Sequence, residues 1–438
     1  MIVLSIIQTY RGYTMKYMRY LVAGALPACI LILIMSFAAQ ADEVRYPVPC
    51  YEGEELAKVR EWEKNWVGKR ITKENIDGVK EFIPETFYSV FTNPDWGGDY
   101  WFEIEPYRQM VPAKGDIALT TKYAGTCTVD DNDNMLNYIG GIPFPHPKKG
   151  IEIAYNFDNR NWGDQYSALQ DVWIIDGKRK YDRKMILMGH CLIFSGRRDI
   201  PPVPELDPNP KGTYWGMHSE YLEPASYKGT RAMSMTWKDR SRDWASWSFS
   251  SATRRITRRS TAQRQSHSGG TDTTYDDSLF WSWAVSCLNV KILGRKELLL
   301  PRHSNREKIL AGHREGYCLF NGGEKERINT WVLEIIHKDP GYIYSKQIWY
   351  VDPEMWWIMY TDKYDKRGKL WKAMEMYMDT YVSKYNGAII PMSTLPLVVD
   401  LERMHATATR SVIELGITGN KEQDIKYYEP RALMRYGY

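Results

Sequence analysis

Hydrophobic and polar residues alternate along residues 343–378 in a pattern that predicts three antiparallel strands. The three runs are rich in Trp, Tyr, Ile and Val, which fit a pleated and half-buried surface. Residues 352–354 and 364–368 separate the runs and supply turn chemistry, because Pro fixes φ and Gly tolerates a positive φ. Both faces of this sheet would be largely apolar, so each face needs a cover. A bound hydrophobic ligand or a second layer of the chain itself would meet that need.

The register of these strands decides which side chains share a face. We expect Val351 to pair with Trp356, and Asp362 to pair with Lys369. A slip of one residue would exchange the two faces. In the expected register one face carries Trp349, Ile358, Tyr360 and Trp371. The other face carries the candidate ligand-binding residues, which are Ile348, Tyr350, Trp357, Met359, Met374 and Met376.

Two amphipathic segments near the N-terminus predict helices that cover one face of the sheet. Residues 54–67 space their Leu, Val and Trp side chains at helical intervals before Gly68. Residues 72–83 do the same with Ile, Val and Phe, and Pro84 ends that run. Residues 93–149 are rich in Pro and Gly, which favours an ordered, extended loop.

Strand-like segments recur along the rest of the chain and are joined by short connections. No helices of βαβ spacing are recognised between them, so we expect antiparallel pairing. So many strands should curl into a large curved sheet or an incompletely closed β-barrel, and the fold class is α+β, mainly antiparallel β, with helices as a cover. A loose tail of about a dozen residues ends the chain. The segments are 151–157, 171–175, 185–194, 214–221, 231–237, 244–250, 290–293, 328–337 and 404–415.

The first 41 residues have the pattern of a secretory signal peptide. Lys16 and Arg19 precede residues 21–39, which are almost all apolar or small, and an A-x-A cleavage site ends at Ala41. An uncleaved N-terminal anchor and a lipoprotein signal at Cys29 are the alternatives. Cleavage would leave residues 42–438 as a single large domain in the periplasm.

The net charge and the number of cysteines argue against two classes of protein, nucleic-acid-binding proteins and disulfide-scaffolded domains. Removing Arg11, Lys16 and Arg19 of the leader from the 58 basic residues leaves 55 against 54 acidic residues. The mature chain is thus nearly neutral, which does not favour nucleic acid as a partner. Its five cysteines are too few for a disulfide scaffold in a domain of this size, so we expect buried thiols. They are Cys50, Cys127, Cys191, Cys287 and Cys318.

Residues 253–274 predict an arginine-rich loop without an acidic residue before Asp272. A guanidinium fork suits phosphate, so the stretch is a candidate contact for an anionic lipid headgroup or an acidic partner. The alternative is a solvated loop in which some arginines pair with Asp276 and Asp277. The candidate residues are Arg254, Arg255, Arg258 and Arg259.

The common catalytic and metal-binding motifs are missing from the sequence. There is no H-E-x-x-H, G-x-S-x-G, C-x-x-C or phosphate-binding Gly loop, and the eight histidines are scattered. Asp130, Asn132 and Asn134 have the spacing of a calcium loop. Met135 and Gly141 stand where that loop requires Gly and Glu, which indicates a turn. We therefore expect no catalytic residues, no metal and no cofactor.

Four segments resemble a family of secreted bacterial proteins, domain of unknown function family 1329 (DUF1329). They are the string IWYVDPEMWWIMYTDKYDKRGKLWK, residues 138–145, residues 253–259 leading to Asp276 and Asp277, and residues 291–298. The resemblance covers about residues 71–399 and departs from the family pattern at the start of the mature chain. It implies the fold of LolA/LolB lipoprotein carriers. It also implies a transporter of the resistance-nodulation-division type and an outer-membrane barrel protein as partners, and no reaction.

These observations predict a periplasmic carrier or binding protein for a lipid or other hydrophobic molecule, and not an enzyme. A cavity wall rich in Met adapts to varied ligands, which fits such a role. An enzyme acting on a hydrophobic substrate in the same cavity is one alternative. A structural envelope protein with a filled core is the other.

Overall fold

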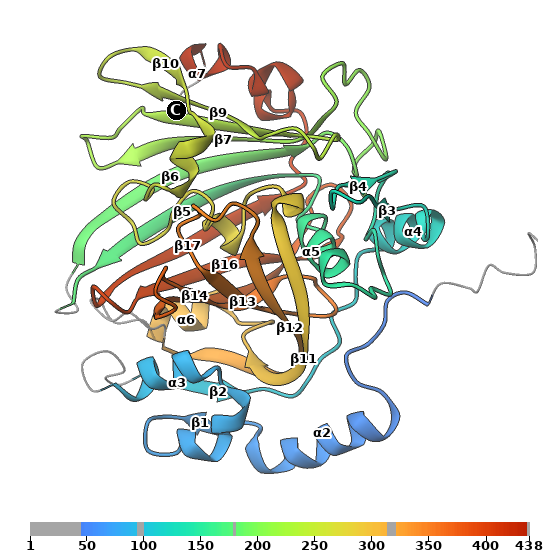
Figure 1. Ribbon diagram of the computed structural model, residues 1–438, viewed down its shortest axis with the longest axis vertical. Helices are drawn as coiled ribbons and strands as arrows, with labels where there is room; N and C mark the ends of the chain where they lie inside the picture. Colours follow the sequence, from blue (N-terminus) through green and yellow to red (C-terminus); the bar gives the residue numbers. More distant parts are fainter. Residues whose placement is uncertain (1–44, 94–99, 178–180, 313–320, 436–438) are drawn as a thin grey trace, which may run out of the picture. The chain divides into compact units, whose positions relative to one another are not determined.

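Most of the described strands form one long sheet whose ends are not joined. The computed structural model describes residues 45–93, 100–177, 181–312 and 321–435. Within these ranges fifteen strands join one strongly curved sheet (Figure 1). No described pairing connects its two end strands, β1 and β10. The elements described here belong to one compact unit that begins at Tyr46.

The order of the strands along the sheet is β1, β2, β12, β13, β14, β15, β16, β17, β5, β6, β7, β8, β9 and β10, and β11 pairs with β12. Among the described pairs only β2 and β12 are parallel. The expected fold class, mainly antiparallel and incompletely closed, is therefore confirmed. The strands are β1 (Arg70–Ile71), β2 (Phe102–Ile104), β5 (Gln165–Ile175), β6 (Tyr181–Ile193), β7 (Thr213–Glu223), β8 (Arg231–Trp237), β9 (Ala245–Ser250), β10 (Arg255–Arg258), β11 (Leu288–Leu300), β12 (Gly323–His337), β13 (Lys346–Val351), β14 (Ile358–Tyr364), β15 (Leu370–Val382), β16 (Ile389–Asp400) and β17 (His405–Leu415).

The first predicted helix is present, and the second is shorter than expected. α2 matches the prediction for residues 54–67, whereas residues 72–83 contain only the 3-10 turn η1. A new helix, α3, begins directly after Pro84. Pro84 ends the preceding helical segment, because it cannot continue a helix. It can stand at the start of α3, because the first turn of a helix does not use the N–H group that Pro lacks. The helices and 3-10 turns used below are α2 (Gly53–Trp66), η1 (Ile76–Phe82), α3 (Glu85–Thr92), α4 (Lys114–Tyr123), α5 (Gly150–Asp158), α6 (Arg306–Gly312), η6 (Ile425–Tyr428) and α7 (Ala432–Arg435).

The prediction of a strand at residues 151–157 is wrong, because this segment forms the helix α5. A short apolar run does not distinguish a strand from a buried helix by its periodicity. The start of the helix is fixed by Glu152, whose carboxylate accepts hydrogen bonds from the backbone N–H groups of Lys148 and Lys149. The other predicted strands fall on strands of the sheet.

Three stretches that were expected to be irregular contain regular elements, and the arginine-rich loop at 253–274 is one of them, because it includes the strand β10. Residues 93–149 include α4 and a hairpin of β3 (Thr128–Val129) and β4 (Met135–Leu136). The expected loose tail is also wrong as far as residue 435, because η6 and α7 pack against the sheet. Tyr428 and Leu433 are buried there, and apolar burial of this kind stabilises a chain end.

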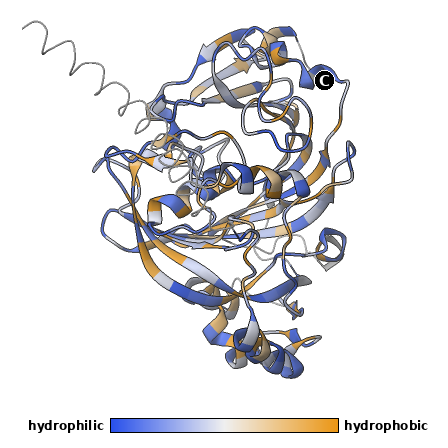
Figure 2. Ribbon diagram, turned by 90° about the vertical axis from the view of Figure 1, so that its right-hand side faces the viewer, coloured by the Kyte–Doolittle hydropathy of each residue, from blue (hydrophilic) through white to orange (hydrophobic). Residues whose placement is uncertain are grey.

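Opposed residues on neighbouring strands share a face, so the registers define two faces of the sheet. Trp349, Thr361 and Met374 lie opposite one another on β13, β14 and β15. Phe157 of α5 packs on Trp349 with a ring separation of 5.8 Å, so we name this the α5 face. The other face carries Tyr360, on which α3 packs, and is named the α3 face. Figure 2 shows hydrophobic and hydrophilic residues alternating along many strands.

The described helices include none that is long and apolar enough to cross a membrane. The predicted signal peptide and its alternatives lie outside the described residues.

Candidate functional site

The six predicted ligand-binding residues do not share a face, so that prediction is wrong. Val351 pairs with Ile358 instead of Trp356, and Asp362 pairs with Ala373 instead of Lys369. Two bulges, between Tyr350 and Val351 and between Lys363 and Tyr364, shift the register further. Each bulge adds one residue to one strand and exchanges the faces beyond it. Ile348 and Tyr350 consequently lie on the α3 face, and Met374 and Met376 lie on the α5 face.

The turn between β13 and β14 is longer than expected, and its extra residues change the register of the two strands. Residues 352–357, rather than three residues, connect β13 to β14. The Asp352 carboxylate accepts the backbone N–H groups of Glu354 and Met355, and Trp356 takes a positive φ of 60°. These bonds hold a wide turn that places Trp357 before the strand.

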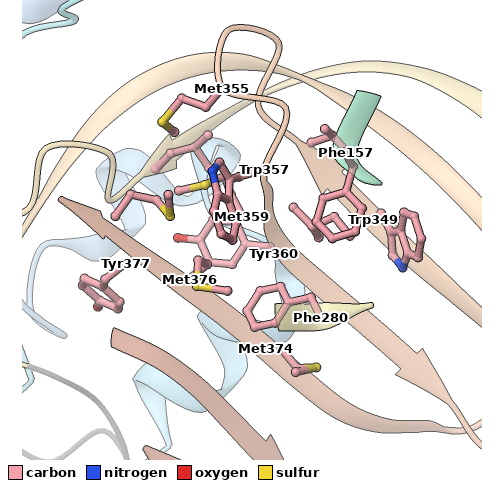
Figure 3. Close-up of a cluster of buried hydrophobic side chains, with 14 of the residues drawn as sticks. Phe157, Phe280, Trp349, Met355, Trp357, Met359, Tyr360, Met374, Met376 and Tyr377 are labelled. Atoms are coloured by element: carbon pink, nitrogen blue, oxygen red, sulfur yellow. The ribbon is translucent and has the colours of Figure 1, made fainter. Parts of the chain in front are cut away.

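Aromatic and methionine side chains fill the α5 face over β13, β14 and β15. Met374 and Met376 are at most 1% exposed and belong to the hydrophobic core. In Figure 3 Phe280 lies close to Met374, and Phe157 lies close to Trp349. That the six predicted residues contact a ligand stays a prediction. The α5 face over β13, β14 and β15, however, is packed interior.

One irregular segment crosses the α5 face, and we name residues 260–287 the strap. Its middle is a narrow hairpin in which His267 bridges to Thr274. Trp281 near its end packs on Trp349, with ring centroids 6.0 Å apart. The strap therefore runs from the edge strand β10 to the middle of the sheet and ends at β11 (Figure 1).

A buried ion pair fixes the strap to the central strands. Asp277 lies 2.5 Å from the ammonium group of Lys363 and 3.7 Å from that of Lys372. All three side chains are fully buried. The hydroxyl group of Tyr344 also donates to Asp277, at 2.7 Å. Burial alone would raise the pKa of Asp277, but the two lysines together hold it well below its usual range.

A second carboxylate, Asp272, fixes the strap to β17, whereas Asp276 forms an ion pair within the strap itself. Asp272 lies 2.8 Å from His405 Nδ1 and accepts a hydrogen bond from the Thr407 hydroxyl group. The hydrogen bond to Asp272 raises the pKa of His405. Asp276 lies 3.4 Å from Arg264, and its burial raises its pKa to about 6.

The same face looks different over the middle of β6, β7, β8 and β9, where a group of small side chains lies next to the buried Cys191, Ile193 and Trp215. Gly189 pairs with Ser219, and Ser219 pairs with Ala232. A methyl group added to Gly189 would approach only backbone oxygens of adjacent strands, at 3.8 and 4.0 Å. The side chains of this small-residue patch are half-buried rather than packed away. The patch consists of Gly189, Ser219, Ala232, Ser234, Ser246 and Ser248.

The opposite face of these strands is closed by the C-terminal segment. Tyr427 hydrogen-bonds His218 Nδ1 at 3.1 Å, and Tyr428 packs on Phe194 with a ring separation of 5.8 Å. Arg231 donates to the backbone oxygen of Leu433 at 2.7 Å. Among the described residues the C-terminal segment therefore covers the α3 face at β7, β8 and β9, and the α5 face of these strands is left for a ligand.

The predicted arginine contacts lie at the edge of the sheet. Arg254, Arg255 and Arg258 are exposed, and Arg259 stacks on the Tyr275 ring at 4.5 Å. The expected pairing with the strap acids is found only for Arg264, because Asp277 pairs with lysines. Binding of an anionic headgroup or partner by the four arginines stays a prediction.

The remaining predictions of chemistry concern a metal site, a turn at Asp130 and the cysteine thiols. Within the described residues no group of three or more His, Cys, Asp or Glu could hold a metal ion. Asp130 accepts the backbone N–H groups of Asn132 and Asn134, so this segment is a turn. The four cysteines in the described ranges are free thiols, three of them buried, and Cys318 lies outside those ranges.

Comparison with known families identifies the chain. The family described as "Protein of unknown function (DUF1329)" matches residues 70–434. The chain belongs to the DUF1329 family. An uncharacterized protein of Pseudomonas aeruginosa is 23% identical over 398 residues, which are 84% of this chain and 81% of that protein.

Solved structures share its fold at low similarity. A DUF1329 family protein from Desulfovibrio piger is 16% identical, with a TM-score of 0.46 over 65% of this chain and 97% of that one. A domain described as outer membrane lipoprotein-sorting, from Vibrio parahaemolyticus, is 14% identical, with a TM-score of 0.46 over 65% and 98%. A LolA superfamily protein from Nitrosomonas europaea is 14% identical, with a TM-score of 0.38 over 64% and 100%. At this level of similarity we transfer no function from these proteins to the DUF1329 chain.

Sequence reasoning missed the residues that hold the strap and the small-residue patch. Lys363 and Lys372 interrupt apolar strands at α5-face positions, and a charge at such a position signals a buried partner. Ser246 and Ser248 alternate along β9, which signals a face without bulky packing. Neither signal reveals by itself which distant segment lies opposite.

Proposed function

We propose that this DUF1329 protein is a passive binding or carrier protein for a lipid or other hydrophobic molecule in the cell envelope. The ligand lies on the α5 face over β6 to β9. The observation that supports this location is the contrast along one face, which is filled by aromatic side chains at β13 to β15 and lined by small, half-buried side chains at the patch. Apolar contact there contributes about 25 cal/mol per Å² of surface removed from water.

The border of the patch supplies apolar contacts that small residues lack. Met217 and Tyr221 of β7 lie on the same face and are half-buried. Gly269 of the strap lies against Met185 and Tyr221, so the strap borders the patch on one side. A polarizable Met and an aromatic ring suit a ligand of varied shape. Met374 and Met376 would reach such a ligand only after the strap moves.

The proposed function includes export of the protein to the cell envelope and two partner proteins there. Export rests on the leader pattern, and N-terminal sequencing of protein from the cell envelope should start at Asp42. A chain that starts at Met1 or Met15 and resists carbonate extraction would show an anchor instead. A transporter of the resistance-nodulation-division type and an outer-membrane barrel protein are the partners that the family resemblance implies.

Blocking the patch tests the proposal. Gly189→Trp and Ser234→Trp put an indole onto the patch, and Leu169→Trp is the matched control, because Leu169 lies on the α3 face and is 39% exposed. We expect the two patch variants to bind a fluorescent fatty-acyl probe at least about tenfold more weakly, the loss that corresponds to ~1.4 kcal/mol. Leu169→Trp should bind it like the wild type. Equal probe affinity in all four proteins, with unchanged thermal stability, would refute the site.

A structural envelope role is the second candidate, because the core around Met376 is filled without a ligand. Mass spectrometry of lipids that co-purify with the native protein separates the two functions. A bound lipid supports the carrier. A protein that carries no lipid and binds no probe supports the structural role.

A further inference from the structure

Exposed arginines gather at the free edge of the sheet. β10 pairs with β9 and has no described neighbour on its other side. Arg254, Arg255 and Arg258 are exposed, and within the described residues none of them has a carboxylate within ion-pairing distance. The positive charge of these three arginines is therefore not neutralised by any carboxylate of the described residues.

The arginines lie on both sides of a strand whose outer backbone groups have no hydrogen-bond partner among the described residues. Arg259 donates its backbone N–H to Ser246 at 2.9 Å, and bonds of an antiparallel pair alternate. The backbone groups of Ile256 and Arg258 consequently point away from β9. Arg255 lies on the α5 face, opposite Ser250, and Arg258 lies on the α3 face. A guanidinium on each face can contact an approaching planar surface along the edge.

The C-terminal helix extends this surface. α7 contacts β8 and β9, and β10 and α7 lie together at the top of Figure 1. Met434 on α7 is 59% exposed, which is high for a large apolar side chain. Arg435 next to it is exposed and has no carboxylate at ion-pairing distance among the described residues. Basic residues around an exposed Met form an amphipathic surface.

We propose that this edge, formed by Arg254, Arg255, Arg258, Met434 and Arg435, docks on an anionic lipid surface. Guanidinium groups bind lipid phosphates in a fork geometry, and Met434 enters the headgroup layer. The inference rests on the proposed carrier function, because the patch reaches this edge where Ser248 pairs with Thr257 of β10. A hydrophobic molecule then passes between the bilayer and the α5 face over the shortest distance.

Vesicle binding by the purified full-length protein tests the docking surface. The vesicles contain phosphatidylcholine alone or phosphatidylcholine with a quarter of phosphatidylglycerol, and bound protein is measured by co-sedimentation. We expect binding only to the anionic vesicles, and its loss at about 0.5 M salt, where charges are screened. The variant Arg254→Gln/Arg255→Gln/Arg258→Gln should bind roughly 100-fold more weakly, since each basic residue near such a surface contributes about fivefold.

A matched variant removes the same charge elsewhere. Lys58→Gln/Lys73→Gln/Lys291→Gln replaces three exposed lysines that have no ion pair among the described residues, and it should bind like the wild type. Equal losses in both triple variants would show a general charge effect and overturn the proposal. So would binding that ignores phosphatidylglycerol.

Two readouts separate this inference from the proposed function. If the fatty-acyl probe binds in solution but anionic vesicles do not, only the docking surface is refuted. If vesicles bind but the probe does not, the carrier function is refuted. A hexaglutamate peptide that binds through the arginines while vesicles do not would assign the edge to an acidic protein partner.

Discussion

Two ends of one sheet face behave differently in this protein. Over β13 to β15 the α5 face is covered by α5 and the strap, and Met374 there is 1% exposed. Over β6 to β9 the same face carries Gly, Ala and Ser, with half-buried Met217 beside them. The face is core at one end and accessible surface at the other because the strap covers only part of it. Four sets of substitutions test this difference, and their expected effects decrease in the order given.

Removing the central strap carboxylate should have the largest effect. Asp277→Ala leaves Lys363 and Lys372 buried without their counter-charge, which typically costs about 3–5 kcal/mol. The free energy of unfolding from urea titration measures this loss. Asp131→Ala, at an exposed position, should cost less than about 0.5 kcal/mol. Similar values for both variants would show that the strap is not anchored to the covered end.

The same substitution at two methionines compares the two ends directly. Met374→Ala creates a cavity in the filled end and should lower the free energy of unfolding by about 2–5 kcal/mol. Met217→Ala on the same face should cost about 1 kcal/mol, because its half-buried side chain has fewer contacts to lose. Denaturant titration of both variants decides between them. An equal loss would contradict the difference between the ends.

The pH dependence of stability reports on the strap carboxylate Asp276. Its folded pKa of about 6 lies above that of an unfolded Asp, so its contribution to stability is most favourable below pH ~4 and is lost as the pH rises toward 6. Asp276→Asn should therefore stabilise the protein by about 1–3 kcal/mol at pH 8 and have little effect at pH ~4. Urea midpoints at both pH values measure this. A destabilised variant at pH 8 would show that the ion pair with Arg264 outweighs burial.

The smallest effect is expected in the patch itself. Gly189→Ala should raise the free energy of unfolding by about 0.5–1 kcal/mol, because a strand glycine loses more entropy on folding than alanine and the methyl group finds space. Gly141→Ala is the opposing control, since Gly141 has a φ of +75° and an added Cβ would lie 2.4 Å from Thr120 N. Thermal unfolding measures both variants. A destabilised Gly189→Ala would show that the space above the patch is already filled.

Local sequence patterns predicted most strands of the sheet correctly. They gave the wrong secondary structure for two short elements. Strands such as β8 and β9 were found because alternation and flanking turns are written in adjacent residues. α5 was mistaken for a strand because nine residues carry too few periods to separate the two patterns. The tail was judged loose because its own residues do not show that Tyr428 and Leu433 meet β7 and β8.

The candidate site could be predicted only in part, because the sequence does not fix the register in which the strands pair. The sequence identified a meander with two apolar faces and the cluster of arginines from Arg254 to Arg259, but it placed these arginines in a loop rather than on the edge strand β10. It did not fix the side of each residue, because two bulges and a wide turn reversed the faces along the strands. Trp349 and Tyr360, expected together, consequently lie on opposite faces.

The family, the strand-rich open sheet and the need to cover apolar faces follow from the amino-acid sequence alone, because they depend on neighbouring residues and their side-chain period. Which face became core, and which part of it stayed half-buried, depended on tertiary contacts. That choice depends on contacts between distant residues, such as Asp277 with Lys363, which are 86 positions apart in the chain. The free energy of such a contact depends on burial and geometry that exist only after the strap lies on the sheet.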